Sequence, residues 1–161
     1  MIFKKFGIII ISLAIAIFIF ASSSPSSAYA AILLYDGASP VSTGCSLDGV
    51  VKASKRLSNG KGTSELRYSP SCKTAWGRII LDSVATHDWQ ANATVYREQD
   101  GKIYSCQDKG GNGVVNKGQR SCYTPMVYDG NGYRADAYGG YYSYPNGVRT
   151  LTGNATTPWY K

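Results

Sequence analysis

The chain contains one histidine, His87, and none of the short motifs that mark common hydrolase and metalloenzyme sites. A histidine zinc site and a serine or cysteine triad both need an imidazole that a second group orients. Asp88 follows His87 directly, but adjacent side chains on an extended chain point in different directions, so the two residues form no ready dyad. Neither G-x-S-x-G nor H-E-x-x-H occurs. We therefore predict a loop position for His87, with no metal, no cofactor and no histidine-based catalysis.

The chain also lacks heptads, long amphipathic helical patterns and repeats of solenoid length, and its one long apolar run lies at the start. Two lysines precede a nearly unbroken apolar run from Ile8 to Ala21, and Ala28-Tyr29-Ala30 fits a small-x-small cleavage site. The run is shorter than the roughly 20 residues that a membrane-spanning helix needs. We predict a cleaved secretory signal peptide over residues 1–30 and a single secreted domain over residues 31–161, with no stable membrane insertion after cleavage.

All four cysteines follow this segment, and an even count in an exported chain is typical of two disulfides. Close C-x-x-C pairs, which a zinc site would favour, are absent. Three pairings are possible. We expect Cys45–Cys72 and Cys106–Cys122, because each closes a loop of modest length between segments that we expect to pair as strands. Each disulfide would stabilise the fold by about 3 kcal/mol.

The charge of the predicted mature chain is moderately positive. Without Lys4 and Lys5, the 17 basic residues fall to 15 against 10 acidic residues, which gives a net charge of +5 with His87 neutral. Such an excess favours anionic partners such as wall polymers through long-range attraction, but it does not determine the fold. The basic residues are scattered from Lys52 to Lys161, as on an ordinary solvated surface.

The clearest local structure is a hairpin. Two β-prone runs, Ala93 to Gln99 and Lys102 to Cys106, flank Asp100-Gly101, and Asp-Gly is a strong signal for a two-residue turn. This turn places Val95 opposite Cys106 and Arg97 opposite Tyr104.

Further strands are expected on both sides of this hairpin. Residues 50–57 and 63–69 form a second hairpin, and residues 74–82 form a central strand with apolar residues on both faces. Trp76 on that strand is therefore either covered or part of an exposed platform, and Gly77 permits close approach of a neighbouring backbone.

Residues 107–121 are expected as an exposed loop, and residues 123–128 as a strand near an edge or bulge because of Pro125. After Asp129 we expect short strands and turns, with residues 150–161 frayed. The fold class is all-β, a small single-domain sandwich or partly closed barrel with two disulfides.

The segment from Leu66 to Ile79 reads L-R-Y-S-P-S-C-K-T-A-W-G-R-I. It resembles the signature of the YjfA-like bacterial family, a domain of unknown function with an L-R-Y-S-x-x-C-[RK]-T-A-W-[AG]-[RK]-[VI] core. Four shorter segments also resemble that family: Tyr35-Asp36-Gly37, Thr43-Gly44-Cys45, Tyr104-Ser105-Cys106 and Ser121-Cys122-Tyr123. The resemblance implies a small secreted β domain and supplies no catalytic residues, because the family has no assigned activity. In some proteins a similar domain is joined to DNA-binding regulators, which suits a binding module.

Carboxylate chemistry is the main enzymatic alternative. It would need two acidic side chains some 5 to 10 Å apart, as in glycoside hydrolysis. The possible members are Asp36, Asp82, Asp129 and Asp136, most of them beside Gly or Asn, where Asp is a common turn residue. Asp129-Gly130-Asn131-Gly132 also lacks the oxygen ligand and glycine that a calcium loop requires at its fifth and sixth positions. We therefore interpret these residues as turn formers.

Aromatic residues are the strongest indication of a binding surface. Twelve tyrosines and three tryptophans remain after residue 30, more than a domain of this size needs for its core. Aromatic rings stack on sugar faces, and arginine or lysine nearby binds anionic groups, although tyrosines are also good strand formers that pack across strands. The candidate binding residues are Arg67, Tyr68, Lys73, Trp76, Arg78, Tyr138, Tyr141, Tyr142 and Tyr144.

The sequence thus favours a secreted, non-enzymatic binding or envelope-associated protein over an enzyme. The expected partner is a cell-wall glycan or an anionic wall polymer; nucleic acid is not expected, because an exported protein rarely meets it. Two alternatives stay open, a carboxylate-dependent enzyme acting on carbohydrate or wall material, and a disulfide-stapled inhibitor or toxin directed at a protein.

Overall fold

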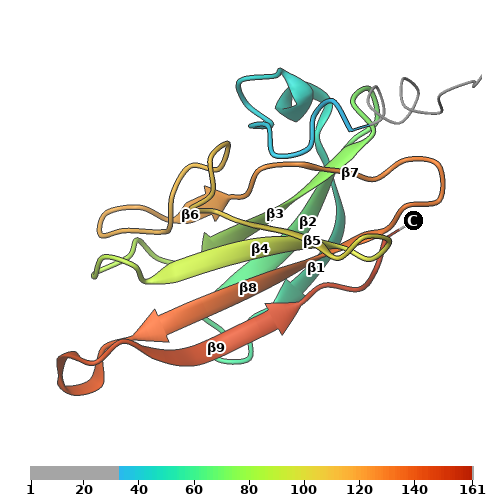
Figure 1. Cartoon of the computed structure of the whole chain (residues 1–161). Helices are drawn as coiled ribbons and strands as arrows, with labels where there is room; N and C mark the ends of the chain where they lie inside the picture. Colours follow the sequence, from blue (N-terminus) through green and yellow to red (C-terminus); the bar gives the residue numbers. More distant parts are fainter. Residues whose placement is uncertain (1–32, 161) are drawn as a thin grey trace, which may run out of the picture.

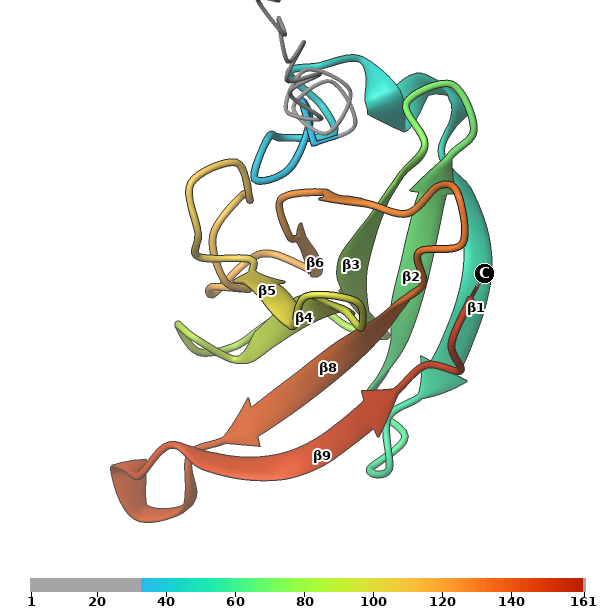
Figure 2. The ribbon, with the colours of Figure 1, turned by 45° about the vertical axis from the view of Figure 1, so that its right-hand side comes forward.

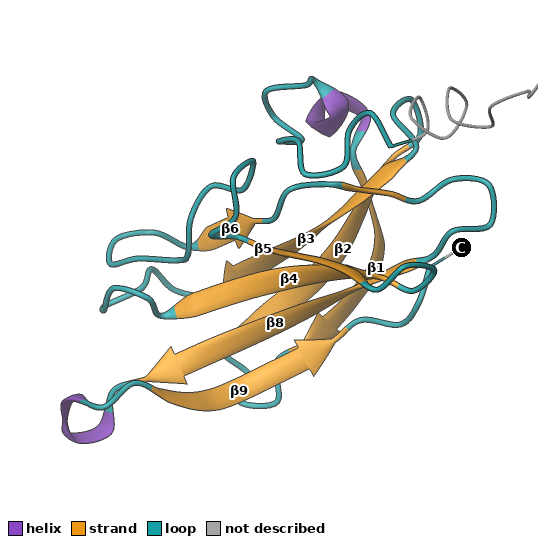
Figure 3. Ribbon diagram, viewed as in Figure 1, coloured by secondary structure: helices purple, strands orange, loops and turns teal. Residues whose placement is uncertain are grey.

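The computed structural model describes residues 33–160 (Figure 1). The predicted signal peptide and its cleavage site lie outside the described residues. The strands are β1 (Val50–Arg56), β2 (Gly62–Ser69), β3 (Thr74–Leu81), β4 (Ala91–Arg97), β5 (Lys102–Ser105), β6 (Ser121–Tyr123), β7 (Val127–Tyr128), β8 (Ala135–Ser143) and β9 (Thr150–Thr156). Within the described residues the helical elements are two short 3-10 turns, η1 (Cys45–Asp48) and η2 (Pro145–Gly147) (Figure 3).

The strands form two antiparallel sheets that pack face to face as a sandwich (Figure 2). Sheet A has the order β1-β2-β3-β6, with β7 also pairing with β3, and sheet B has the order β5-β4-β8-β9. The Cys106–Cys122 disulfide joins β6 in sheet A to the end of β5 in sheet B. Elsewhere the two sheets are joined where Ser58, just after β1, donates its backbone N–H to Asn154 O at 3.0 Å. The prediction of an all-β sandwich with these two disulfides is confirmed.

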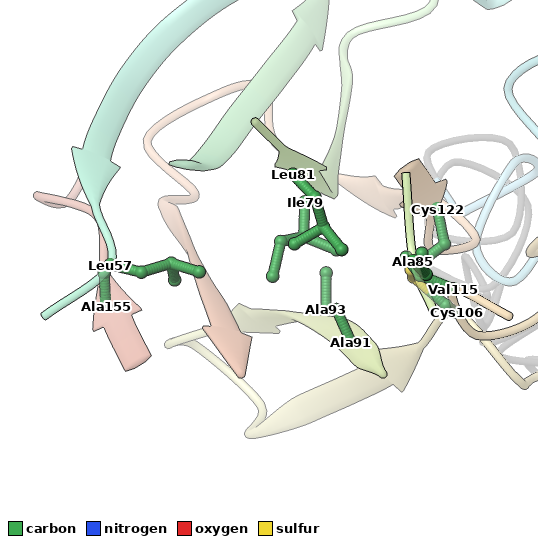
Figure 4. Close-up of a cluster of buried hydrophobic side chains, with 10 residues drawn as sticks. All are labelled: Leu57, Ile79, Leu81, Ala85, Ala91, Ala93, Cys106, Val115, Cys122 and Ala155. Atoms are coloured by element: carbon green, nitrogen blue, oxygen red, sulfur yellow. A yellow bond between two sulfur atoms is a disulfide. The ribbon is translucent and has the colours of Figure 1, made fainter. Parts of the chain in front are cut away.

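The core combines large side chains from sheet A with small ones from sheet B. Ile79 and Leu81 point inward from β3 (Figure 4), and Leu66 of β2 is also buried in the core. The facing positions of β4 and β8 are mostly small: Ala91, Ala93, Ala135, Ala137 and Gly139. This combination lets the sheets approach closely. At Gly77 on β3 the backbone of β4 is so near that a Cβ there would lie 2.8 Å from the backbone oxygen of Thr94. The expected close approach at Gly77 is therefore confirmed.

The first hairpin forms, but its predicted register is wrong by two residues. Val95 pairs with Tyr104 and Arg97 with Lys102, so the turn holds the four residues 98–101 rather than Asp100-Gly101 alone. The reason is the fully buried Arg97 side chain, whose guanidinium donates to Asp100 Oδ1 at 2.9 Å and Oδ2 at 2.6 Å. Asp100 also accepts from the backbone N–H of Lys102 at 3.2 Å. These bonds close a four-residue turn that the Asp-Gly pattern does not predict.

The second hairpin and the central strand lie where the sequence predicts them, as β1, β2 and β3. The strand expected over residues 123–128, near an edge or bulge, forms at the edge of sheet A as two short pieces, because β6 and β7 pair with β3 on either side of an irregularity that contains Pro125. Between β6 and β7 the Thr124 side chain continues the pairing with β3, because its Oγ1 accepts a hydrogen bond of 3.0 Å from the backbone N–H of Gly77.

Two expectations about the later chain are wrong. The 107–121 loop is not wholly exposed, because Val114 and Val115 are buried and Val115 pairs with Ala91. The region after residue 129 also holds the longest strand, β8, and residues 150–156 are paired with it as β9 rather than frayed.

Candidate functional site

The nine candidate binding residues do not gather on one surface. Arg67, Trp76 and Arg78 lie on the outer face of sheet A, whereas Tyr138 and Tyr142 lie on the outer face of sheet B. The other four occupy separate positions, which are Tyr68, Lys73, Tyr141 and Tyr144. The two groups therefore lie on opposite sides of the sandwich.

Tyr68 and Tyr141 face inward. Tyr68 packs against the core and lies 5.7 Å from the Tyr160 ring, centroid to centroid. Tyr141 is half-buried, and its hydroxyl accepts a hydrogen bond of 2.7 Å from the amide of Gln90, beside a cavity of about 150 Å³. Both tyrosines therefore have structural contacts.

Tyr144 and Lys73 lie in connecting segments. The Tyr144 ring stacks on His87 with 4.7 Å between centroids, and His87 is exposed in the loop before β4, as expected. Lys73 is exposed in the β2–β3 turn, where its φ of 53° is unusual for a residue other than glycine.

The outer face of sheet A is covered at one end by the chain's own residues 35–49 (Figure 1). Trp76 is only 3% exposed and packs against Cys45 and Met126, and a Cβ at Gly49 would lie 2.5 Å from the indole. The Cys45–Cys72 disulfide fastens η1 to the β2–β3 turn beside it. Trp76 is therefore not an exposed platform; the alternative of a strand covered on both faces is the one that forms.

Beside Trp76 the covering segment leaves a cavity of about 170 Å³. Its lining includes Arg67, Arg78 and Tyr123 from the sheet and Pro40, Val41 and Ser46 from the covering segment. The Arg67 guanidinium lies 5.9 Å from the Trp76 ring centroid and donates to Gly49 O at 2.8 Å. Thus Arg67, Trp76 and Arg78 do meet, in a small cavity rather than on an open surface.

The outer face of sheet B carries partly exposed aromatic rings. Alternation along β4 and β8 turns Tyr96, Asp136 and Tyr138 outward while Val95 and Ala137 point into the core. The Tyr138 ring lies over Gly140, since a Cβ there would be 3.3 Å from Tyr138 Cε1. Burial raises the pKa of the Tyr138 hydroxyl, with a smaller contribution from Tyr142.

Each end of this face combines a tryptophan, a tyrosine and an arginine. Near the start of β8, Trp159 contacts Tyr96 with 5.7 Å between centroids, and the Arg134 guanidinium lies 5.4 Å from the Trp159 ring. Near its end, Trp89 contacts Tyr142 at 6.0 Å, and Arg149 lies 4.2 Å from the Trp89 ring. We call the set Trp89, Tyr96, Tyr138, Tyr142 and Trp159, with Arg134 and Arg149, the aromatic face.

Sequence reasoning missed most of the aromatic face. The alternation of residues 93–99 could have placed Tyr96 outward, opposite the apolar Val95. Arg134 directly precedes β8, and the β8–β9 hairpin brings Arg149 and Trp159 to the same face. The Trp89–Tyr142 and Tyr96–Trp159 contacts also need β4 to pair with β8. No local pattern predicts that pairing, because the two strands are far apart in the sequence.

The acidic residues do more than form turns. Asp36 and Asp100 both bind the buried Arg97, at 2.7 Å and 2.6 Å, and this ion pair lowers the pKa of Asp100 to about 2. Asp129 lies nearby, is 4% exposed, and its carboxyl oxygens accept no hydrogen bond from any described residue. Burial raises the pKa of Asp129 to about 7, although Arg97 opposes the shift. The turn interpretation is thus incomplete for Asp36 and Asp129, which belong to a buried charged cluster.

The other two acidic candidates lie elsewhere. Asp82 forms an exposed ion pair with Arg56 at 2.7 Å, and Asp136 is half-buried on the aromatic face, where burial raises its pKa. Asp129 does not line either of the cavities described above. Among residues 33–160, no group of three histidine, cysteine or acidic side chains is placed to hold a metal ion.

Comparison with known proteins identifies the family. The model of a family of proteins of unknown function, DUF2690, matches residues 34–138, from the covering segment through most of the aromatic face. The chain belongs to the DUF2690 family. Its similarity to the uncharacterized protein YjfA of Bacillus subtilis (strain 168) is 45% identity over 116 residues, which cover 70% of this chain and 73% of that protein. The resemblance noted in the sequence is confirmed.

No solved structure matches the chain. The two disulfides are of the kind that persists in oxidising, extracellular environments. In the part of the DUF2690 protein that the structure describes, there is no helix with the length and apolar character of a membrane span.

Proposed function

We propose that this DUF2690 protein is a secreted, non-enzymatic binding domain that holds an extended anionic polysaccharide of the cell wall on its aromatic face. The observation that supports this proposal is the pairing of partly exposed rings with arginines at both ends of one sheet face. Tyrosine and tryptophan combine a flat apolar surface with a polar group, and so suit the apolar faces and hydroxyls of sugars.

The dimensions of the face favour a chain-like ligand. Asp136 and Tyr142 lie six residues apart on β8, which corresponds to roughly 20 Å at the usual rise of a strand. A ligand that contacts both ends must therefore be extended. Tyr138 lies between the two ends and continues the row of rings.

One unpaired positive charge on the face, that of Arg149, favours an anionic polymer, while burial raises the pKa of Asp136 on the same face and so disfavours its negative charge. Arg149 has contacts with the rings of Trp89 and Tyr142, and no ion pair joins it to an acidic side chain among the described residues. Arg134 is paired with Glu98, so it contributes less free charge. A ligand with spaced negative groups would gain from Arg149 directly, while the rings provide contacts that salt does not screen.

Retention on isolated cell wall tests the proposal. The purified, oxidised protein should bind wall saturably at low and high salt, and Tyr142→Ala or Trp159→Ala should weaken binding by about 5- to 100-fold, the range measured for aromatic stacking on bases. Leu47→Ala is the matched control, because Leu47 is 92% exposed on η1 and lies off the aromatic face. Wall stripped of anionic polymer and a panel of neutral glycans identify the component that binds. Equal binding by all three variants and the parent protein would contradict the proposal.

A further inference from the structure

The cavity beside Trp76 has unused hydrogen-bond donors. The Arg78 guanidinium makes no hydrogen bond to any described residue, and its nearest acidic partner, Glu65, lies 4.0 Å from Nη1. Glu65 Oε2 also lies 3.6 Å from Arg67 Nη1, and this buried oxygen accepts no hydrogen bond within the described part of the chain. Two guanidinium groups therefore share one carboxylate at distances too long for hydrogen bonds. The site keeps a net charge of +1 and several free N–H groups.

Apart from Ser46 and Tyr123, the rest of the lining is apolar, and it is held in place. Pro40, Val41 and Trp76 line the cavity together with the two guanidinium groups. The covering segment has its own hydrogen bonds, from Ser46 N to Pro40 O at 2.8 Å and from Thr43 Oγ1 to Ser39 O at 2.8 Å. The Cys45–Cys72 disulfide fastens it to sheet A. The cavity is thus preformed, which reduces the entropic penalty of binding.

From this arrangement we infer that the cavity between residues 40–46 and β3 is a second binding site, which takes the C-terminal carboxylate of a short peptide ending in a small apolar residue. Arginine matches a carboxylate with two parallel hydrogen bonds, and the single net positive charge suits one carboxylate. A volume of about 170 Å³ is near that of an engineered cavity in another protein that holds a benzene molecule. It therefore fits one small side chain with its carboxylate rather than a sugar chain.

The chemistry of the site disfavours a phosphate ligand. A phosphate dianion would bring two charges to a site whose net charge is +1, close to the buried Glu65 carboxylate. It would also leave the apolar wall of Pro40 and Val41 without a partner. An acidic sugar offers the same carboxylate as a peptide, but its ring hydroxyls would face that apolar wall. The peptide is therefore the better match.

Nuclear magnetic resonance of the three tryptophan indole N–H groups tests this site without depending on the proposed function. Titration with N-acetyl-Ala-Ala should shift the Trp76 signal saturably and leave the Trp89 and Trp159 signals, which report on the aromatic face, unchanged. The same peptide with a C-terminal amide should bind at least 10-fold more weakly, because it lacks the charge. Inorganic phosphate and glucuronate are the other two probes.

Variants complete the test. Arg78→Gln should weaken peptide binding by about 10- to 100-fold, the effect expected for losing a charge-assisted hydrogen bond. Arg78→Lys should recover part of it, since the charge returns without the planar fork. Arg149→Gln, on the aromatic face, should change nothing at this site. Thermal unfolding of each variant confirms that it is folded.

Three results would overturn the inference. Equal binding of the acid and the amide would show that the carboxylate is not recognised. Tighter binding of phosphate or glucuronate than of the peptide would assign the site to another anion. An unchanged Trp76 signal at saturating peptide, in a folded protein, would mean that the cavity takes no such ligand.

Discussion

The two outer faces of the sandwich carry similar side chains, but one face is covered by another segment of the chain and the other is open. On sheet A, Trp76 lies beside two arginines, but residues 35–49 cover it and leave it 3% exposed. On sheet B, Trp159 also lies beside an arginine, but it is 43% exposed. The composition of a strand face therefore does not determine whether the face is open. A remote segment, fastened here by the Cys45–Cys72 disulfide, makes that difference.

The largest expected effect comes from truncating the covered ring. Trp76→Ala should lower the free energy of unfolding by about 3–5 kcal/mol, because it leaves a cavity under η1. Urea denaturation of the oxidised protein measures this change. The matched variant Trp159→Ala should have a much smaller effect on the open face, and equal losses for both tryptophans would contradict the comparison.

Opening the covered face is the second way to test the comparison. Replacing both Cys45 and Cys72 with serine should lower the free energy of unfolding by about 3 kcal/mol, since the bridge restricts the unfolded chain by closing a loop between residues 27 positions apart. It should also increase quenching of Trp76 fluorescence by an added quencher, measured in a variant whose other two tryptophans are phenylalanine. Removing Cys106 and Cys122 is the control, because that bridge packs in a different core cluster from Trp76. No gain in quenching specific to the first pair would show that the disulfide does not hold the cover in place.

The buried cluster between the faces predicts an unusual pH dependence. The pKa of Asp129 is raised from 3.8 to about 7 in the folded protein, so folding favours its protonated form. Its contribution to stability is full below pH 4 and is lost as the pH rises through about 7. The free energy of unfolding should therefore rise as the pH falls from 8 to 5, by an amount on the order of 3 kcal/mol at most.

Asp129→Asn should remove most of that rise, because the amide has a similar shape and does not titrate. The low pKa of Asp100 acts in the opposite direction, but only as the pH falls below about 4. Chemical denaturation at a series of pH values measures both proteins. A parallel pH dependence in the variant would show that another group is responsible.

The smallest expected effect is on the stability of the open face. Tyr142→Ala and Trp159→Ala should each change the free energy of unfolding by less than about 1 kcal/mol, as expected for partly exposed side chains outside the core. The same denaturation experiment measures them. Losses similar to that of Trp76→Ala would mean that these rings are structural and would weaken the proposed function.

Much of the fold could be predicted from the local sequence. The hairpins, the central β3 strand and both disulfides follow from β-prone runs, turn residues and an even cysteine count. The register of the β4–β5 hairpin could not be predicted, because it depends on the buried Arg97, which binds both Asp100 in the turn and Asp36, 61 residues away in the sequence.

The candidate site was less predictable for the same physical reason. Tyr138 and Tyr142 were identified, but the Trp89–Tyr142 and Tyr96–Trp159 contacts form only because β4 pairs with β8, a strand that is distant in the sequence. Trp76 was identified as a ring on a central strand, and its cover comes from residues 35–49. Long-range packing thus determines which aromatic residues can meet a ligand.

The most direct test of the central claim is to titrate the protein with soluble fragments of anionic wall polysaccharide while following the three indole N–H signals. If the aromatic face binds the polymer, the Trp89 and Trp159 signals should shift together and saturably, at low and high salt, while the Trp76 signal stays in place. No shift of Trp89 and Trp159, or a shift of Trp76 alone, would contradict the assignment of polysaccharide binding to the outer face of sheet B.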